Sequence, residues 1–397
     1  MTAAVEAPDG VWSQVVGQPA VVEELRAAVT DPAAMTHAWL FTGPPGSGRS
    51  VAARAFAAAL QCPDGGDGTC HECRTVLAGT HADVHLVVPE GLSIKVEEAR
   101  EIVRIAGRAP SGGRWQVILI EDADRMSEQA ANAVLKMIEE PPPRTVVMLC
   151  APSLHPDDVS VTIRSRCRLV RLRTPGVDAI ADVLVRRDGV DPALAAWSAA
   201  ASGGHVGRAR RLARDEDARL ARKAVLDVPL SLVSLAACLD AADDLVGAAE
   251  EETEAATSVL DAAETEAVKA SLGYGARGPG VVAARGGGAG QLKELEKRQK
   301  SRATRLGRDS LDRALVDLAG LYRDALVLAA TAVDGGEPPQ LLHPDRRADA
   351  QELARRIGAE GALRRIDALL GCRLALEQNV KPRIALEALT VALRLPA

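Results

Sequence analysis

Aromatic side chains are scarce in this sequence: its 397 residues include four tryptophans, two tyrosines and two phenylalanines, 2% of the chain. The hydrophobic cores must therefore be built from Ala, Leu, Val and Ile, which suits helices and buried strands. No apolar run reaches the roughly 18 residues that a membrane-spanning helix needs. Residues 1–11 contain acidic side chains and no basic one, unlike the start of a secretory signal. We therefore expect a cytoplasmic protein with no membrane partner.

Basic residues do not outnumber acidic ones, and the formal net charge is −6. This balance excludes a protein that coats DNA through bulk electrostatic attraction, so any DNA contact must be a local patch. Without a secretory signal, the seven cysteines are expected to be reduced thiols or metal ligands, not disulfides. A chain of this length is expected to form two or three domains.

Five short apolar segments alternate with helical patterns in the first 170 residues. Because helices separate the segments, they are typical of a parallel sheet covered by helices on both faces. The predicted strands are residues 38–41, 84–88, 115–120, 146–149 and 169–172, and two clear helices span 50–60 and 127–140.

The sequence changes character after the Pro175-Gly176 pair. Three short helical patterns follow, at about 177–188, 191–201 and 205–215, and from about 226 the pattern is helical throughout. A glycine-rich tract over 273–290 is expected to be a flexible loop. We predict an α/β core over 1–173, a small helical lid over 174–225 and a helical bundle over 226–397.

A glycine-rich loop lies between the strand at 38–41 and the following helix, and this is the context of a Walker A phosphate loop. Its residues are Gly43, Pro44, Pro45, Gly46, Ser47, Gly48, Arg49 and Ser50. Glycines let backbone N–H groups surround phosphates, and Ser50 stands where a hydroxyl would bind Mg²⁺. However, Arg49 replaces the lysine of the motif, and a planar guanidinium does not substitute for an ammonium. The loop is therefore expected either to bind ATP or ADP without hydrolysis or to bind no nucleotide.

Acidic residues follow the strand at 115–120, at the carboxyl end where α/β proteins place their sites. A Walker B motif has Asp first, for the metal, and Glu second, to activate water. Here Glu121 comes first and Asp122 second, so the presumed base is one methylene short. A misplacement of about 1 Å can cost on the order of 10²-fold in rate. The site is expected to be degraded for catalysis.

Several further segments carry a family resemblance. They are Val15–Gln18, Leu149–Ser153, the helix Asn132–Glu140 with Pro141 and Pro142, the Ser165-Arg166-Cys167 motif, and Gln378–Glu387. In this order and spacing they resemble the clamp-loader subunits of bacterial DNA polymerase III, which belong to the AAA+ class. A broken Walker pair beside an intact Ser-Arg-Cys motif is the delta-prime pattern. The hydrolysing gamma/tau subunits are expected to have Lys in the loop and Asp-Glu in Walker B.

The resemblance implies an AAA+ core, a lid and an all-α oligomerisation collar. It implies that Arg166 is an arginine finger for the ATP site of a neighbouring gamma/tau subunit, that Val16 lies over the adenine, and that Arg208 is the sensor-2 arginine. The implied partners are gamma/tau and delta, and indirectly the sliding clamp and primed DNA. The chain would be a component of the polymerase holoenzyme, a nucleotidyltransferase complex, and would not hydrolyse ATP alone.

Two other functions compete with this one. The chain could be an active AAA+ ATPase, gamma/tau-like or a Holliday-junction motor, but Arg49 and the Glu121-Asp122 order argue against it. It could be a nucleotide kinase, but the long helical C-terminal region argues against that. A turnover assay on the isolated chain separates them.

Three cysteines, Cys62, Cys70 and Cys73, lie within a dozen residues directly after the phosphate-loop helix. The resembled family has a four-cysteine zinc module at this place. A structural Zn²⁺ needs four ligands, and the fourth here is Asp67 or, less favourably placed between two cysteines, His71. The alternative is a degenerate knuckle with free thiols.

Basic residues crowd the stretch 293–308. The set comprises Lys293, Lys297, Arg298, Lys300, Arg302, Arg305 and Arg308. We favour a solvated helix face or a docking face for an acidic neighbour over a nucleic-acid patch.

Overall fold

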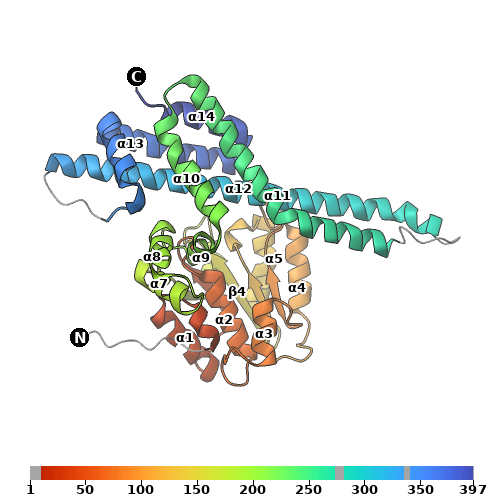
Figure 1. The fold of residues 1–397 in the computed structure, drawn as a ribbon. Helices are drawn as coiled ribbons and strands as arrows, with labels where there is room; N and C mark the ends of the chain where they lie inside the picture. The colour runs from red at the N-terminus through yellow and green to blue at the C-terminus, as the bar shows by residue number, and fades with distance from the viewer. Residues whose placement is uncertain (1–9, 273–280, 335–339, 397) are drawn as a thin grey trace, which may run out of the picture. The chain divides into compact units, whose positions relative to one another are not determined.

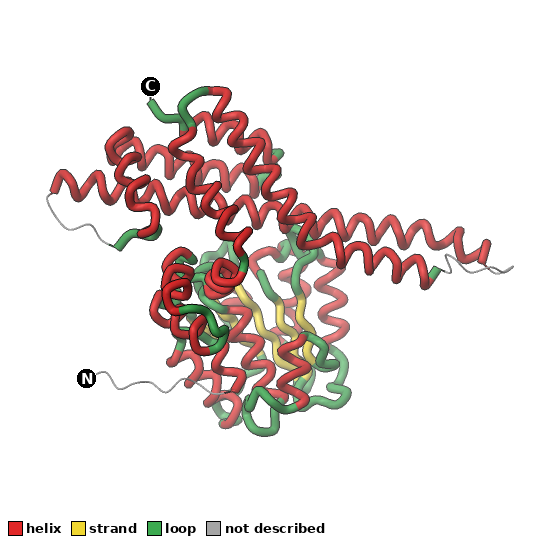
Figure 2. The backbone as a smooth tube through the Cα atoms, viewed as in Figure 1, coloured by secondary structure: helices red, strands yellow, loops and turns green. Residues whose placement is uncertain are grey.

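The computed structural model describes residues 10–272, 281–334 and 340–396. The chain forms two compact units, Met1–Arg214 and Asp215–Ala397. The first holds all the strands of the described residues, and the second is helical (Figures 1 and 2). The finer boundaries predicted at 173/174 and 225/226 remain predictions.

The first unit is built on a parallel sheet of five strands in the order β2-β3-β4-β1-β5. Every strand pair is parallel, and β1 lies between β4 and β5. The strands are β1 (Ala38–Thr42), β2 (Val84–Val87), β3 (Gln116–Ile120), β4 (Thr145–Ala151) and β5 (Arg168–Arg171). Each lies within two residues of the segment predicted from sequence, because uninterrupted apolar runs mark strands buried on both faces.

Helices cover both faces of this sheet. Trp39 and Phe41 point into one core, beneath α1, α2 and α3, while Ala38 and Leu40 point into the other, beneath α4 and α5. This alternation follows from the two-residue period of a strand. The helices are η1 (Gly10–Gln14), α1 (Pro19–Thr30), α2 (Arg49–Gln61), α3 (His71–Ala78), α4 (Val96–Ala106), η2 (Ala123–Arg125), α5 (Glu128–Glu139) and α6 (Val161–Arg164).

Helix α2 runs from the glycine-rich loop to the cysteine cluster. Its residues 55–61 are all buried, and six of the seven are apolar, with Phe56 the one aromatic residue among them. Alanine loses no side-chain rotamer freedom in a helix and lets the backbone lie close to its neighbours. The helix thereby connects the two candidate sites directly.

Three short helices complete the first unit: α7 (Val177–Arg186), α8 (Pro192–Ala201) and α9 (Val206–Arg214). They share a small core of their own, formed by Ile180, Leu184, Ala195, Ala199 and Ala209. Val16 from the N-terminal segment is buried in the same core. These helices lie where the three short helical patterns were predicted, at about 177–188, 191–201 and 205–215; we refer to them as the lid.

The second unit contains α10 (Glu216–Ser231), α11 (Leu235–Ser271), α12 (Val281–Asp334), η3 (Pro344–Arg346), α13 (Arg347–Glu377) and α14 (Pro382–Leu393). Its leucine-rich core joins these α-helices. The α13 backbone is interrupted at Gly358, which has a φ of 63°. The predicted fold class is confirmed in its main features: an α/β core with a parallel sheet flanked by helices, and an all-α C-terminal region.

One prediction about this unit is wrong in part. The glycine-rich loop was expected over 273–290, but α12 begins at Val281. A glycine costs a helix only about 1 kcal/mol relative to alanine, so a long helix can continue through several of them. Residues 273–280 lie outside the described residues.

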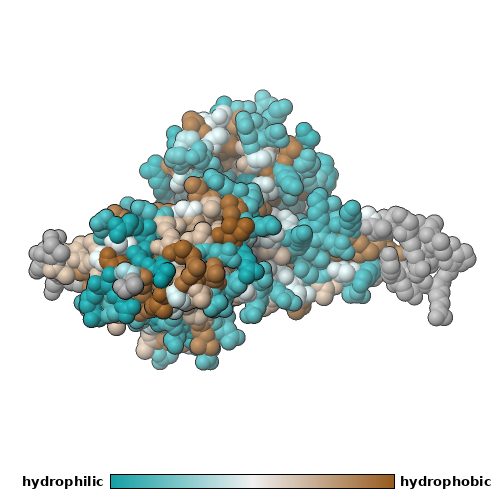
Figure 3. Space-filling view, turned by 90° about the horizontal axis from the view of Figure 1, so that it is seen from above, coloured by the Kyte–Doolittle hydropathy of each residue, from teal (hydrophilic) through white to brown (hydrophobic). Residues whose placement is uncertain are grey.

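Within the described ranges, no helix is long and apolar enough to cross a membrane. On the face drawn in Figure 3, hydrophilic side chains cover much of the surface and hydrophobic ones form smaller patches among them.

Candidate functional site

The phosphate loop has the expected backbone. It follows β1, and α2 begins at Arg49 directly after Gly48. Gly46 and Gly48 have φ angles of 83° and 91°, which L-amino acids with side chains adopt rarely. The glycines of the loop are therefore required by its shape, as a phosphate cradle demands.

Arg49 does not extend toward a phosphate position. Its Nη1 donates to the carbonyl oxygen of Gly43, at the start of the same loop, at 2.7 Å. The guanidinium is thus used to close the loop on itself. Cys150, in β4, lies against Ser50, and burial raises the pKa of its thiol. A buried neutral thiol offers no charge for catalysis.

Glu121 is also engaged inside the protein. Arg54 donates to its carboxylate at 2.9 Å, and the Glu121 side chain is only 17% exposed. Asp122 lies in the left-handed region, with a φ of 53°. The acid that would bind a metal therefore has a guanidinium as its partner.

Sequence reasoning missed Arg54 and gave no separate role to Asp124, one of the acids after β3. Arg54 lies four residues after Ser50 and so on the same face of α2; this spacing could have revealed it. Asp124 is half-buried, and burial, with the nearby Asp122 charge, raises its carboxyl pKa.

The lid packs closely on the phosphate loop. A Cβ atom built on Gly46 would lie 2.6 Å from the Cβ of His205, just before α9. The cavity bounded by Val16, Ser47, Gly48 and Val206 has a volume of about 100 Å³. Small-molecule sites usually measure about 300–1,000 Å³, so this cavity is smaller than a typical ligand pocket.

The predicted nucleotide residues are only partly brought together. Val16, Ser47 and Gly48 line the cavity, but Arg208 does not belong to its lining. The lid arginines that do line it are Arg187 and Arg210. Both form ion pairs with the buried carboxylate of Asp188. Their position at the cavity is therefore accounted for by this ion pair within the lid.

Arg166 is exposed, as a residue that acts on a partner must be. Its side chain is 39% exposed and forms an ion pair with Glu139, at the end of α5, at 2.8 Å. A second contact, from its Nη1 to the Thr162 carbonyl, is 3.0 Å long. These contacts hold the guanidinium at the surface.

Two neighbouring arginines, Arg164 and Arg168, also have partners within the chain. Arg164 donates to the Leu154 carbonyl at 3.1 Å. Arg168 pairs with Glu24 at 2.9 Å and lies over the Trp39 ring at 5.1 Å. Both are positioned by their own chain, so Arg164 is a poor inert control for Arg166.

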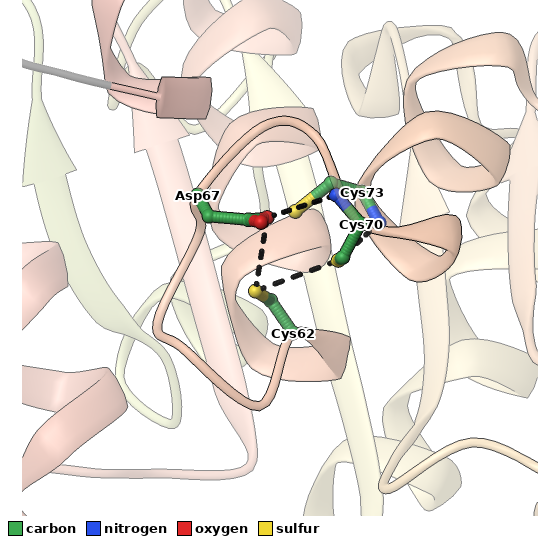
Figure 4. A group of neighbouring side chains, drawn as sticks. All are labelled: Cys62, Asp67, Cys70 and Cys73. Carbon is green, nitrogen blue, oxygen red and sulfur yellow. Dashed lines mark hydrogen bonds between the residues drawn. The ribbon is translucent and has the colours of Figure 1, made fainter.

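The cysteine cluster brings four potential ligands together (Figure 4). One ligand atom each from Cys62, Asp67, Cys70 and Cys73 lies within 4.8 Å of all the others. Cys62 follows the end of α2 and Cys70 caps α3, while Asp67 comes from the glycine-rich turn between them. His71 is exposed and does not belong to the group.

The spacing of these atoms fits a tetrahedral metal. Zn–S bonds of about 2.3 Å and a Zn–O bond of about 2.1 Å imply S–S and S–O separations of about 3.8 and 3.6 Å. The Cys62 and Cys70 sulfurs are 3.6 Å apart. The Cys62 sulfur and an Asp67 oxygen are 3.4 Å apart. The residues present fit Zn²⁺.

The electrostatics of the cluster agree with a cation. Burial raises the pKa of the Cys73 thiol. Hydrogen bonds from Thr69 and from the Cys70 backbone hold the pKa of the Asp67 carboxyl well below its usual range. Asp67 thus supplies a permanent negative charge, and the thiols need a cation to become thiolates.

The basic stretch on α12 has an acidic neighbour inside the chain. Arg302 lies between Asp261 and Glu264 of α11. Its Nη1 donates to Glu264 at 3.1 Å. Lys293, Lys297 and Lys300 are exposed.

Comparison with known proteins gives three findings on this framework. Residues 17–176 match the model of the family described as DNA polymerase III, delta subunit. The chain is 32% identical over 212 residues to the delta-prime subunit of Bacillus subtilis DNA polymerase III, covering 53% of this chain and 63% of that one. It is 37% identical over 183 residues to the delta-prime subunit of Pseudomonas aeruginosa, covering 44% and 55%.

Over this region the chain is similar to delta-prime subunits. The similarity spans less than two thirds of either delta-prime relative. A tau/gamma subunit from Haemophilus influenzae is 32% identical over 202 residues, covering 48% of this chain and 29% of that one. The loop and acid residues, not identity alone, therefore decide between the two kinds of subunit.

Proposed function

We propose that this chain is the delta-prime subunit of a clamp loader that places the sliding clamp of DNA polymerase III on primed DNA. In this role it does not hydrolyse ATP. It braces the ring beside gamma/tau and delta and supplies Arg166 to the ATP site of a neighbouring gamma/tau subunit. Such a protein works in the cytoplasm, as part of the polymerase holoenzyme.

The internal neutralisation of the phosphate site supports this proposal most strongly. Arg49 is bonded to the loop carbonyl of Gly43, and Glu121 is paired with Arg54. A hydrolysing subunit needs these positions for the γ-phosphate and Mg²⁺. An active gamma/tau-like ATPase, the second candidate, would have to break both interactions. The AAA+ family suggests that ATP or ADP, with Mg²⁺, can bind once the lid moves away from Gly46, without being hydrolysed.

Exposed leucines on α13 support assembly into a ring. Leu363, Leu370 and Leu374 are 49%, 50% and 54% exposed and recur at spacings of seven and four. This spacing places them on one face of the helix. An exposed apolar stripe of this kind is typical of a protein–protein contact, and the collar would use it for partner subunits.

Zinc has a structural role in this proposal. Cys62, Asp67, Cys70 and Cys73 would hold one Zn²⁺ at the junction of α2 and α3. A closed four-ligand site leaves no open position for a substrate. The ion would fix the turn at 63–69 and would take no part in ATP chemistry.

The deciding experiment replaces Arg166 with alanine in assembled rings. An arginine finger is worth about 10³–10⁵ in rate at its own ATP site. We expect normal assembly and a marked loss of DNA- and clamp-stimulated ATP hydrolysis. The loss measured on the whole ring should be smaller than the loss at the affected site, because the other ATP sites keep their arginine fingers. Arg166→Lys should rescue poorly, since a point charge does not reproduce a fork of donors.

Arg186→Ala is a matched control, because Arg186 is also an exposed arginine paired within the chain, with Asp182 at 2.6 Å. It should leave hydrolysis unchanged. Glu139→Gln removes the intrachain partner of Arg166 and should also keep hydrolysis near normal. If Arg166→Ala rings load clamps at the normal rate, Arg166 has no role in the neighbouring site.

A further inference from the structure

A second cavity lies at the opposite edge of the sheet from the phosphate loop. It has a volume of about 560 Å³. Its lining includes residues just before three strands: His37 before β1, Trp115 before β3 and Arg144 before β4. The phosphate loop, in contrast, follows the carboxyl end of β1. The cavity is therefore separate from the nucleotide site.

The lining combines an apolar floor with two cations. Met35, the half-buried Trp115 and the three consecutive prolines 141–143 provide the apolar part. Arg114 and Arg144, both exposed, provide the charge. Among the described residues, neither arginine has a carboxylate within ion-pair distance, so both keep their full charge for a ligand.

The two guanidinium groups are held in place by backbone carbonyls. Nη1 of Arg114 donates to the Cys62 carbonyl at 3.0 Å. Arg144 donates from Nε to the Arg114 carbonyl at 2.8 Å and from Nη2 to the Gly113 carbonyl at 3.0 Å. These bonds limit side-chain motion without neutralising the charge, and each group keeps further N–H donors. Less entropy is then lost on binding an anion.

Arg144 has an unusual backbone as well. Its φ angle is 61°, in the left-handed region that non-glycine residues occupy at a cost of roughly 1–2 kcal/mol. Asn or Gly would adopt this conformation more readily. A strained arginine beside an apolar cavity is an observation that points toward binding.

We propose that this cavity binds an acidic peptide segment of a partner protein, with a bulky apolar side chain on the proline and tryptophan floor. Carboxylates beside that side chain are recognised by Arg114 and Arg144. A volume of 560 Å³ accommodates one or two side chains. Two cations are too few for a nucleic-acid track, which neutralises several phosphates, and the chain carries a net charge of −6.

The test is a selection from displayed peptides that are aspartate-rich and randomised at a few central positions, with the full-length protein as bait. We expect enrichment of peptides with Leu, Ile, Met or an aromatic residue between acids. Binding of a selected, fluorescein-labelled peptide should weaken about tenfold or more in Arg114→Gln and in Arg144→Asn, since each loses a charge-assisted hydrogen bond. Asn suits the left-handed backbone, so Arg144→Asn is expected to stay folded.

Arg100→Gln, at an exposed position on α4, is the control and should bind normally. Replacing the apolar residue of the peptide with Ser should weaken binding as strongly as either arginine variant. The proposal is overturned if no peptide is enriched, or if the selected peptides bind both arginine variants as well as the wild type. Tighter, Arg114-dependent binding of oligothymidylate than of any peptide would also overturn it and assign the cavity to nucleic acid.

Discussion

The two ends of α2 have opposite electrostatic character. At its start, Arg49 bonds to the loop carbonyl of Gly43 and Arg54 pairs with Glu121, so each charge has a partner within the chain. At its end, ligand atoms of three cysteines and of the Asp67 carboxylate lie within 4.8 Å of one another. Under the proposed function, the phosphate-loop end does not hydrolyse ATP and can neutralise its own charges, whereas the cysteine end keeps its ligand atoms together for Zn²⁺. The two ends of the same helix thus differ in whether their charged and polar groups are paired within the chain.

The largest expected effect comes from breaking the cysteine end. Wild-type protein should contain one zinc per chain, and Cys73→Ser should abolish it. Because zinc binding contributes directly to folding, we expect the free energy of unfolding to fall by at least about 4 kcal/mol. Metal analysis and urea unfolding measure both. Cys167→Ser, at a half-buried cysteine outside the cluster, should keep its metal. Metal-free wild-type protein from zinc-replete cells would show that the ligands have become plain thiols.

The loop end should resist repair by a single substitution. Arg49→Lys restores the residue of the motif but leaves Glu121 paired with Arg54 and the acids in reversed order. We expect ATP turnover by the isolated protein to remain far below about 1 s⁻¹, the low end of ordinary enzyme rates. A turnover assay with Mg²⁺ measures it, and wild type should be equally inactive. Turnover near 1 s⁻¹ in Arg49→Lys would show that the lysine alone was missing.

The fourth ligand can be identified by comparing Asp67 with His71. Asp67→Ala should leave three thiolates and a water, and should weaken zinc binding at least about tenfold. His71→Ala should leave the affinity unchanged, because the His71 side chain lies outside the cluster. Competition with a metal chelator measures both affinities. If His71→Ala weakened zinc binding and Asp67→Ala did not, His71 would be the fourth ligand.

The smallest effect concerns the loop that carries Arg114. Burial alone would raise the pKa of Asp83, but N–H groups of Ser111, Gly112 and Gly113 and the Ser111 hydroxyl hold it well below its usual range. The folded-state pKa is therefore lower than the unfolded value of about 3.9. The stabilisation is present above pH 4 and is lost as the pH falls through the folded-state pKa.

Asp83→Asn should lower the free energy of unfolding at pH 7 by about 1–3 kcal/mol. The difference from wild type should shrink in urea titrations below pH 4. Asp157→Asn, whose side chain is 89% exposed, should show neither effect. If the difference in free energy of unfolding between wild type and Asp83→Asn were the same at all pH values, the charge of Asp83 would not contribute to stability.

The fold was largely predictable because its signals are local. Apolar runs marked the five strands, Ser127 caps α5 through the Ala130 N–H, and Pro192 begins α8. The buried face of α5 is less easily predicted: Ala130, Val134, Met137 and Ile138 are buried, whereas the equally apolar Leu135 is only half-buried. The exact rotation of a helix depends on what packs against it, which the sequence alone does not state.

The sequence predicted which residues belong to each site, but not how those residues contact one another. Motif spacing indicated the phosphate loop and the cysteine cluster. It did not indicate that Arg54 neutralises Glu121 or that His205 lies on Gly46, because these pairs are 67 and 159 residues apart and depend on tertiary packing. Likewise, the paired arginines Arg114 and Arg144 meet only because β3 and β4 are neighbours.

The alanine-rich build of α2 limits how this protein can change. Ala55, Ala57, Ala58 and Ala59 have no exposed surface. A larger residue at any of them would overpack the core, typically at about 1–3 kcal/mol, and glycine would weaken the helix by about 1 kcal/mol. A scan of all substitutions at these alanines should find that both larger residues and glycine destabilise the protein. The packing of this helix therefore fixes the separation between the phosphate loop and the cysteine cluster, and substitutions at either end can change a site without changing that separation.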